Sequence, residues 1–173
     1  MLESKEPIFE VTKQFELAHD AKNIAFVIGA SWESKIYPKE SLLEVCQELQ
    51  EHAYIIWGSE KERTDAEWIC ERCSYAELAP KLQLNELVSY ISSMDLLIGN
   101  DTGPTHMAWA QNIPSITLFG PTNSRMIFQT PKNIAIESPS EVNILKINKD
   151  DFSIKEIAPQ YITKKAKELL YGL

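Results

Sequence analysis

Short apolar runs and amphipathic stretches alternate along most of this chain. The apolar runs are continuous, which is typical of strands that are buried on both faces of a parallel sheet. The alternation therefore predicts an α/β fold with a doubly wound, six-stranded parallel sheet. The expected strands are 23–29, 54–57, 75–78, 95–98, 115–119 and 133–136, and the expected helices are 38–51, 60–73, 84–93 and 104–111.

The composition fits an ordinary globular protein and limits the possible ligands. With 173 residues, of which 44% are hydrophobic, the chain can bury a full core. No apolar run approaches the roughly 20 residues that span a bilayer, and no signal peptide is recognisable, so we expect a cytoplasmic protein. The net charge of −8 argues against a nucleic-acid partner. An anionic ligand therefore needs a local group of cations and backbone amides.

The three cysteines do not suggest a metal site. Cys70 and Cys73 form a single C-x-x-C motif inside a predicted helix, and Cys46 lies elsewhere. A metal site would need a second pair or nearby histidines, and a thioredoxin-like motif would lie at a strand-to-helix turn. We therefore expect free thiols in a reducing compartment.

The turn after the fourth expected strand, residues 100–106, reads Asn-Asp-Thr-Gly-Pro-Thr-His. Because Pro104 begins a predicted helix, unpaired backbone amides and the positive end of the helix dipole converge here, which favours an anion such as phosphate. Asp101 and Thr102 add groups that bind hydroxyls, and His106 lies one turn into the helix. In the structural alternative, Asp101 or Thr102 only caps the helix.

A second loop is expected to face this turn. In the usual strand order 3-2-1-4-5-6, the first and fourth strands are neighbours, and ligands bind outside their carboxyl ends. Residues 30–35 follow the first strand, so Lys35 can supply a cation and Ser31 a hydroxyl or amide for a phosphate. The alternative for Lys35 is a lysine side chain in solvent.

An acidic residue after the second strand often holds the ribose diol in nucleotide-binding sheets. Glu60 and Glu62 both qualify by position. The alternative for both is a favourable negative charge near a helix N-terminus. The sequence contains no G-x-G-x-x-G motif, which disfavours a dinucleotide oxidoreductase.

Several short motifs follow one another between residues 26 and 136. They are Gly29-Ala30-Ser31, Lys35-Ile36-Tyr37-Pro38, Trp57-Gly58 with Glu62, Pro80-Lys81-Leu82, the turn at 100–106, and Phe119-Gly120-Pro121-Thr122. In this order and spacing, they resemble the C-terminal, donor-binding domain of the lipopolysaccharide heptosyltransferases, which are GT-B glycosyltransferases that use ADP-heptose. The resemblance implies one Rossmann-like half of a GT-B enzyme.

The resemblance also implies a role for eight residues, and it implies neither a metal nor another cofactor. Family members often have a second small hydroxyl residue at the place of Trp32, so the role of Trp32 stays open. The implied roles are Ser31 and Lys35 at the diphosphate, Glu62 at the ribose hydroxyls, Leu82 against the adenine, Asp101 at the heptose hydroxyls, Thr102 and Gly103 as backbone amides at the phosphates, and His106 at the diphosphate or the sugar.

By this resemblance, the full protein transfers heptose from ADP-heptose to the Kdo of the lipopolysaccharide inner core with inversion, at the cytoplasmic face of the inner membrane. The catalytic base and the site for Kdo-lipid A are expected in a missing N-terminal acceptor domain, so the isolated chain should bind ADP-heptose or ADP without turnover. Two alternatives stay open. One is another sugar-nucleotide enzyme of the same fold, such as a UDP-sugar epimerase or a different glycosyltransferase. The other is a non-catalytic nucleotide-binding module.

The expected organisation has three parts. Residues 1–22 read as a linker with a remnant of the acceptor domain, 23–150 as the nucleotide-sugar-binding domain, and 151–173 as a helical segment. In the last part, residues 153–156 suggest a capping box, and Gly172 is expected to end the helix. An apolar stripe should either stay partly uncovered for the acceptor domain or pack on its own sheet. It consists of Ile162, Ala166, Leu169 and Leu170.

Overall fold

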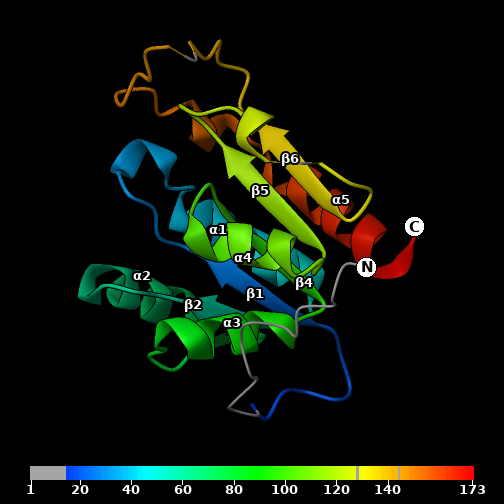
Figure 1. Cartoon of the computed structure of the whole chain (residues 1–173). Coiled ribbons are helices and arrows are strands. Elements are labelled where there is room, and N and C mark those ends of the chain that lie inside the picture. The colour runs from blue at the N-terminus through cyan, green and yellow to red at the C-terminus, as the bar shows by residue number, and fades with distance from the viewer. Residues whose placement is uncertain (1–14, 128, 144) are drawn as a thin grey trace, which may run out of the picture.

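The computed structural model contains one six-stranded parallel sheet with the order β3-β2-β1-β4-β5-β6, so the predicted fold class and strand order are confirmed (Figure 1). The structure describes residues 15–127, 129–143 and 145–173. Residues 1–14 of the predicted linker at 1–22 therefore lie outside the described residues, and residues 15–22 lie within them. The strands are β1 Asn23–Val27, β2 His52–Ile56, β3 Ala76–Leu78, β4 Leu96–Asn100, β5 Ser115–Phe119 and β6 Asn133–Glu137.

The sheet is covered by helices on both faces (Figure 1). Helices α1, α2 and α5 pack on one face, and α3 and α4 pack on the other. Every residue of β1, β4 and β5 is buried, which explains why these strands read as continuous apolar runs. The helices are α1 Lys39–Leu49, α2 Glu60–Cys70, α3 Leu84–Ser92, α4 Gly103–Ala110 and α5 Pro159–Tyr171.

Two hydrophobic cores lie on opposite faces of the sheet because successive side chains of a strand point to opposite sides. Phe26 of β1 belongs to the core beneath α1 and α5, and its neighbour Val27 belongs to the core beneath α3 and α4. Phe15 and Leu17 join the second core from the segment before β1. The sheet is thus packed on both faces, and the loops at its carboxyl edge extend from buried strands.

The C-terminal segment differs from the prediction in how its helix begins. Residues Ser153–Glu156 form a separate 3-10 helix rather than a capping box, and Ser153 shares a hydrogen bond of 2.7 Å with Ser138 through their hydroxyls. Helix α5 begins at Pro159 because the residue before a proline is disfavoured in the helical region. Gly172 has a φ of 68° and ends α5 as predicted.

The apolar stripe of α5 faces the protein itself. Ile162 and Ala166 are completely buried, while Leu169 and Leu170 are partly buried against the same core. Helix α5 lies alongside α1 (Figure 1). The structure therefore favours the alternative in which the stripe packs on its own sheet.

Candidate functional site

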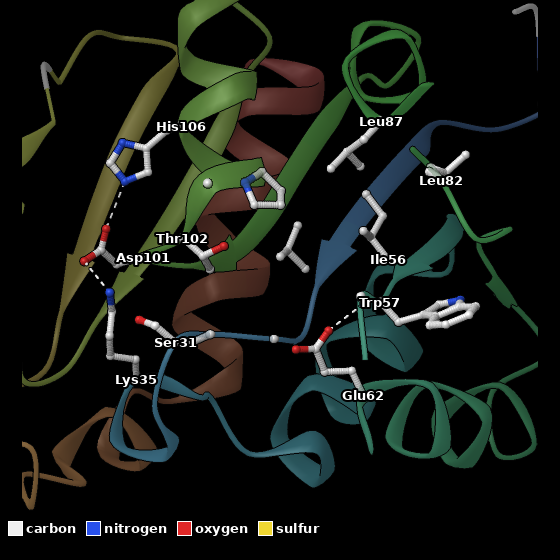
Figure 2. Close-up of a pocket in the computed structure, with 16 residues that line it drawn as sticks. Ser31, Lys35, Ile56, Trp57, Glu62, Leu82, Leu87, Asp101, Thr102 and His106 are labelled. Atoms are coloured by element: carbon white, nitrogen blue, oxygen red, sulfur yellow. Dashed lines mark hydrogen bonds and ion pairs between the residues drawn. The ribbon is translucent and has the colours of Figure 1, made fainter. Parts of the chain in front are cut away.

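The candidate site lies at the carboxyl ends of β1 and β4, which are neighbours at the point where the strand order reverses. Ligands bind at this point in open α/β sheets. A cavity of about 460 Å³ opens here (Figure 2). All eight residues suggested by the sequence line this cavity: Ser31, Lys35, Glu62, Leu82, Asp101, Thr102, Gly103 and His106.

Lys35 projects into the site from a short 3-10 helix, Glu33–Lys35, in the loop after β1. Its side chain is only 10% exposed, and its Nζ lies 3.1 Å from Asp101 Oδ2. The same ammonium lies 4.6 Å from the ring centroid of Trp32. The alternative of a lysine side chain in solvent is therefore wrong. Ser31, by contrast, is an exposed residue of the cavity wall.

Asp101 connects three side chains at one end of the cavity (Figure 2). Its Oδ1 lies 3.0 Å from His106 Nε2, and its Oδ2 accepts a hydrogen bond of 2.9 Å from Thr122 Oγ1 in addition to the Lys35 ion pair. Burial alone would raise the pKa of Asp101. The hydrogen bond from His106, the charge of Lys35 and the hydrogen bonds from Lys35 and Thr122 together lower that pKa below its ordinary value. Asp101 is therefore a carboxylate at neutral pH.

Helix α4 begins at the cavity with its first backbone amides available. Thr102 is the N-cap residue, but its side chain makes no capping hydrogen bond within the described chain, and the Asp101 carboxylate binds Lys35 and His106 instead. The first N–H groups of a helix have no partner inside it, and a ligand can take their place. The capping alternative for Asp101 and Thr102 is therefore wrong, because neither side chain closes this helix end.

Glu62 lies on α2 between the two ends of the cavity (Figure 2). It forms a capping box with Ser59: its Oε2 accepts hydrogen bonds from the N–H of Gly58 at 2.6 Å and of Ser59 at 3.3 Å. Glu62 thus lies in the first turn of α2, as its structural alternative expected, and it also caps this helix. Its carboxylate also fills the space beside Gly29, where a Cβ atom would come within 2.3 Å of Oε1. Glu62 is therefore both a cap and part of the cavity wall, whereas Glu60 does not line the cavity.

The other end of the cavity is apolar. Leu82 lies there with Ile56 and Leu87, two residues that the sequence analysis did not select (Figure 2). Trp57 also lines this end, and its indole Nε1 donates a hydrogen bond of 2.7 Å to the carbonyl of Ala79. The cavity therefore runs from an apolar end, past one carboxylate, to a charged end.

The sequence matches the family description "Glycosyltransferase family 9 (heptosyltransferase)" over residues 4–156. The chain belongs to this family. Lipopolysaccharide heptosyltransferase 1 of Campylobacter coli is 38% identical and aligns with 95% of this chain but 54% of its own length. The chain thus spans about half the length of the curated relatives it matches.

Two solved structures confirm the fold of this family 9 chain. Escherichia coli ADP-heptose lps heptosyltransferase II superposes with a TM-score of 0.74 at 24% identity, over 94% of this chain and 50% of that chain. Escherichia coli heptosyltransferase WaaC with ADP-2-deoxy-2-fluoro heptose superposes with a TM-score of 0.72 at 20% identity, over 88% of this chain and 45% of that chain. The fold is thus that of one half of a GT-B enzyme.

In this family 9 chain, two further residues support the site, and they belong to the motifs at residues 100–106 and 119–122. Thr122, from the loop after β5, holds Asp101. Asn100 is 1% exposed, its Oδ1 accepts a hydrogen bond from the N–H of Tyr37, and its Nδ2 donates to the carbonyls of Ile28 and Gly29. Asn100 therefore joins the loop after β1 to the end of β4. A polar residue at the end of a buried run was the signal for it.

Outside the cavity, the structure also bears on the three cysteines, on metal-binding groups and on membrane-spanning helices. Cys46, Cys70 and Cys73 are free, and burial raises the pKa of the Cys46 thiol and raises that of Cys70 to about 11. Within the described chain, no group of three or more histidine, cysteine, aspartate or glutamate side chains is placed to hold a metal ion. Among the described helices, none is long and apolar enough to cross a membrane.

Proposed function

We propose that this chain is the donor-binding half of a heptosyltransferase, and that the whole protein transfers heptose from ADP-heptose to the Kdo of the lipopolysaccharide inner core. The observation that carries the proposal is the order of groups along one cavity. An apolar end, a single carboxylate, and a cation beside an open helix N-terminus follow one another. Adenine, ribose and diphosphate have the same order and the same chemistry.

Each part of the donor then has a partner. Adenine lies against Leu82 and its apolar neighbours, and the ribose hydroxyls bind the Glu62 carboxylate. Lys35, Ser31 and the backbone amides at Thr102 and Gly103 bind the diphosphate. Asp101 and His106 lie beyond the phosphates, so they are the groups that can bind the sugar. The structure of a family relative with ADP-2-deoxy-2-fluoro heptose supports this choice of donor.

The chemistry asked of this chain is stabilisation of the leaving group. An acceptor hydroxyl attacks the anomeric carbon of the heptose while the bond from that carbon to the distal phosphate oxygen breaks, which inverts the configuration. A base removes the hydroxyl proton, and negative charge develops on ADP. Lys35 and the positive end of α4 offset this charge without a divalent cation. We place the base, and the binding of the lipid-linked acceptor at the inner membrane, in the part of the relatives that this chain does not match.

Calorimetry with ADP-heptose, ADP and UDP-N-acetylglucosamine tests the donor. The expected result is binding of both ADP ligands, unchanged by EDTA, and no comparable binding of the UDP-sugar. Asp101→Ala should weaken ADP-heptose much more than ADP, because the proposed partner of Asp101 is the sugar. Equal losses for both ligands would remove the sugar assignment. Tighter binding of the UDP-sugar would favour another sugar-nucleotide enzyme of this fold.

A radiolabelled ADP-heptose assay with a Kdo-containing acceptor tests the division of labour. The chain alone should transfer no heptose, because the proposed base is absent from it, and it should bind ADP more weakly than a full-length relative that can close around the ligand. Heptose transfer by the 173-residue chain would show that it contains its own base.

A further inference from the structure

A second cavity of about 310 Å³ borders the Lys35–Asp101 ion pair. Lys35 and Asp101 line both cavities, so the two spaces meet at this pair. The second cavity therefore begins where the charged end of the first one stops. Its walls come from the loops after β1, β4, β5 and β6, and they consist of Trp32, Lys35, Asp101, Thr122, Asn123, Arg125, Val142 and Ile147.

Arg125 brings an uncompensated positive charge to this cavity. Arg63 pairs with Glu60 and Glu67, and Arg72 contacts Glu71. For Arg125, no carboxylate in the described part of the chain lies within 4.0 Å, although the chain carries 25 acidic residues. An arginine at a cavity wall without an acidic partner is suited to an anionic group of a ligand, because its guanidinium fork matches a carboxylate or a phosphate.

The turn that carries Arg125 is itself well held. Asn123 Oδ1 accepts a hydrogen bond of 3.2 Å from the backbone N–H of Arg125, and Glu137 Oε1 accepts one of 2.8 Å from the N–H of Ser124. Thr122, one step earlier, is bound to Asp101. The backbone is therefore fixed by its neighbours, while the guanidinium is left for another partner.

Trp32 gives the cavity an aromatic wall with an unmatched donor. Its ring lies 4.6 Å from Lys35 Nζ and 4.9 Å from Lys149 Nζ, measured to the ring centroid. Its indole Nε1 is buried and has no hydrogen-bond partner among the described residues. Aromatic walls with nearby hydrogen-bond donors are suited to sugar rings, which offer both C–H faces and oxygen atoms. The two ammonium groups add to the positive charge around this wall.

We infer that the second cavity binds a sugar ring that carries a carboxylate or phosphate, with Arg125 as the partner of the anionic group. This inference rests on the proposed function, because a sugar at this place lies next to the distal phosphate of the donor and is therefore on the acceptor side. This chain then contributes part of the acceptor site itself. The volume of the second cavity, about 310 Å³, is close to the lower limit for small-molecule sites, roughly 300 Å³. A volume of this size fits a single sugar.

Each cavity is lined by its own tryptophan, Trp57 in the first and Trp32 in the second. Because Lys35 lines both cavities and lies 4.6 Å from the centroid of the Trp32 ring, ADP is brought to saturation first, so that later shifts of the Trp32 signal report the second cavity. Indole N–H signals in ¹⁵N-labelled protein are assigned with Trp32→Phe and Trp57→Phe variants. ADP is titrated first, and then the sugar acid Kdo, glucose 6-phosphate or neutral glucose is added. We expect ADP to move the Trp57 signal, and both anionic sugars, but not glucose, to move the Trp32 signal.

Three arginine variants test the assignment of the anionic group. Arg125→Gln should weaken the Kdo-dependent shift of Trp32 by roughly tenfold or more, as expected for the loss of a charge-assisted hydrogen bond. Arg125→Lys should restore part of the loss. Arg72→Gln removes the same charge from an exposed position in the turn after α2 and should leave the titration as in the wild type.

The outcomes separate this inference from the proposed function. If glucose moves the Trp32 signal as well as Kdo does, or if Arg125→Gln binds Kdo like the wild type, the anionic-sugar site is wrong even when ADP binds. If ADP fails to move Trp57, the proposed function is wrong whatever Trp32 does. Tighter binding of Kdo than of glucose 6-phosphate identifies the carboxylate as the recognised group, and the reverse order identifies the phosphate.

Discussion

Helices α2 and α4 both begin at the carboxyl edge of the sheet with a hydroxyl residue and a nearby acid, but they use these residues in opposite ways. At α2, Ser59 Oγ accepts a hydrogen bond from the N–H of Glu62, and the Glu62 carboxylate accepts one from the N–H of Ser59. At α4, the side chain of Thr102 makes no capping bond among the described residues, and Asp101 is bound to side chains from other elements.

The difference shows how a helix start becomes either a structural or a binding feature. Side-chain oxygens satisfy the first amides of α2, which stabilises the helix. At α4 the acid is held away by Lys35, His106 and Thr122, so the amides and the helix dipole are left for an anion. We therefore expect changes at α2 to affect stability first and changes around α4 to affect ligand binding first.

The largest effect should come from removing the cation beside α4. Lys35→Ala is expected to weaken ADP binding by roughly 1.5–3 kcal/mol, the range for a hydrogen bond to a charged group. Calorimetry measures the affinity, and circular dichroism checks the fold. Lys39→Ala is the matched control because it removes a partly exposed lysine whose partner is Asp65. Equal losses in both variants would mean that general charge, not the α4 site, governs binding.

The next effect should come from blocking the open helix end. A Cβ atom on Gly103 meets no protein atom within 4 Å, so a side chain there extends into the space left for the ligand. Gly103→Val should weaken ADP binding by about tenfold, or 1.4 kcal/mol, with little change in melting temperature. Ala110→Val at the exposed far end of α4 serves as the control. Undiminished ADP affinity in Gly103→Val would show that the helix start is not used.

A smaller effect should separate the two caps by stability. Ser59→Ala removes a hydrogen-bonded cap and should lower the free energy of unfolding by about 1 kcal/mol. Thr102→Ala should change it little, because the threonine side chain does not cap α4. Urea unfolding of both variants measures the difference. A larger loss for Thr102→Ala than for Ser59→Ala would reverse the comparison.

The smallest effect concerns pH and Asp101. Its pKa is lowered in the folded state, so its contribution to stability is present above the unfolded value, about 3.9. That contribution is lost as the pH falls through the folded pKa. Asp101→Asn should therefore lose less stability between neutral pH and pH about 3 than the wild type does. Thermal unfolding across this range measures it, with Asp65→Asn as the control. Parallel curves for wild type and Asp101→Asn would argue against the lowered pKa.

The strands could be predicted because burial on both faces leaves a local mark, a continuous apolar run, on each of them. The meeting of Lys35 and Asp101 could be predicted as well, because the strand order alone brings their two loops together. Thr122 could not be selected in this way, since its contact with Asp101 depends on the path of the loop after β5.

Local motifs gave wrong predictions where the side chain forms its hydrogen bonds with residues from other elements of the fold. Residues 153–156 have the spacing of a capping box, but the hydroxyl of Ser153 forms a hydrogen bond with that of Ser138. Helix α5 begins only at Pro159. Asp101 and Glu62 both lie near the expected start of a helix, so a structural role at a helix N-terminus was an alternative for each of them. Only the side chains around each carboxylate separate them, and the sequence does not place those side chains.

The burial of the C-terminal segment bears on how the protein can be handled. Ile154, Ile157, Ile162 and Ala166 belong to the same core as β1 and β4, and a Cβ atom on Gly120 would meet Ile154 at 2.7 Å. Shortening the chain at residue 150 would expose that core to water, and we expect the shortened chain to aggregate. The loops around the cavity therefore depend on residues 151–173 for a complete core, and we do not expect them to fold as a smaller unit.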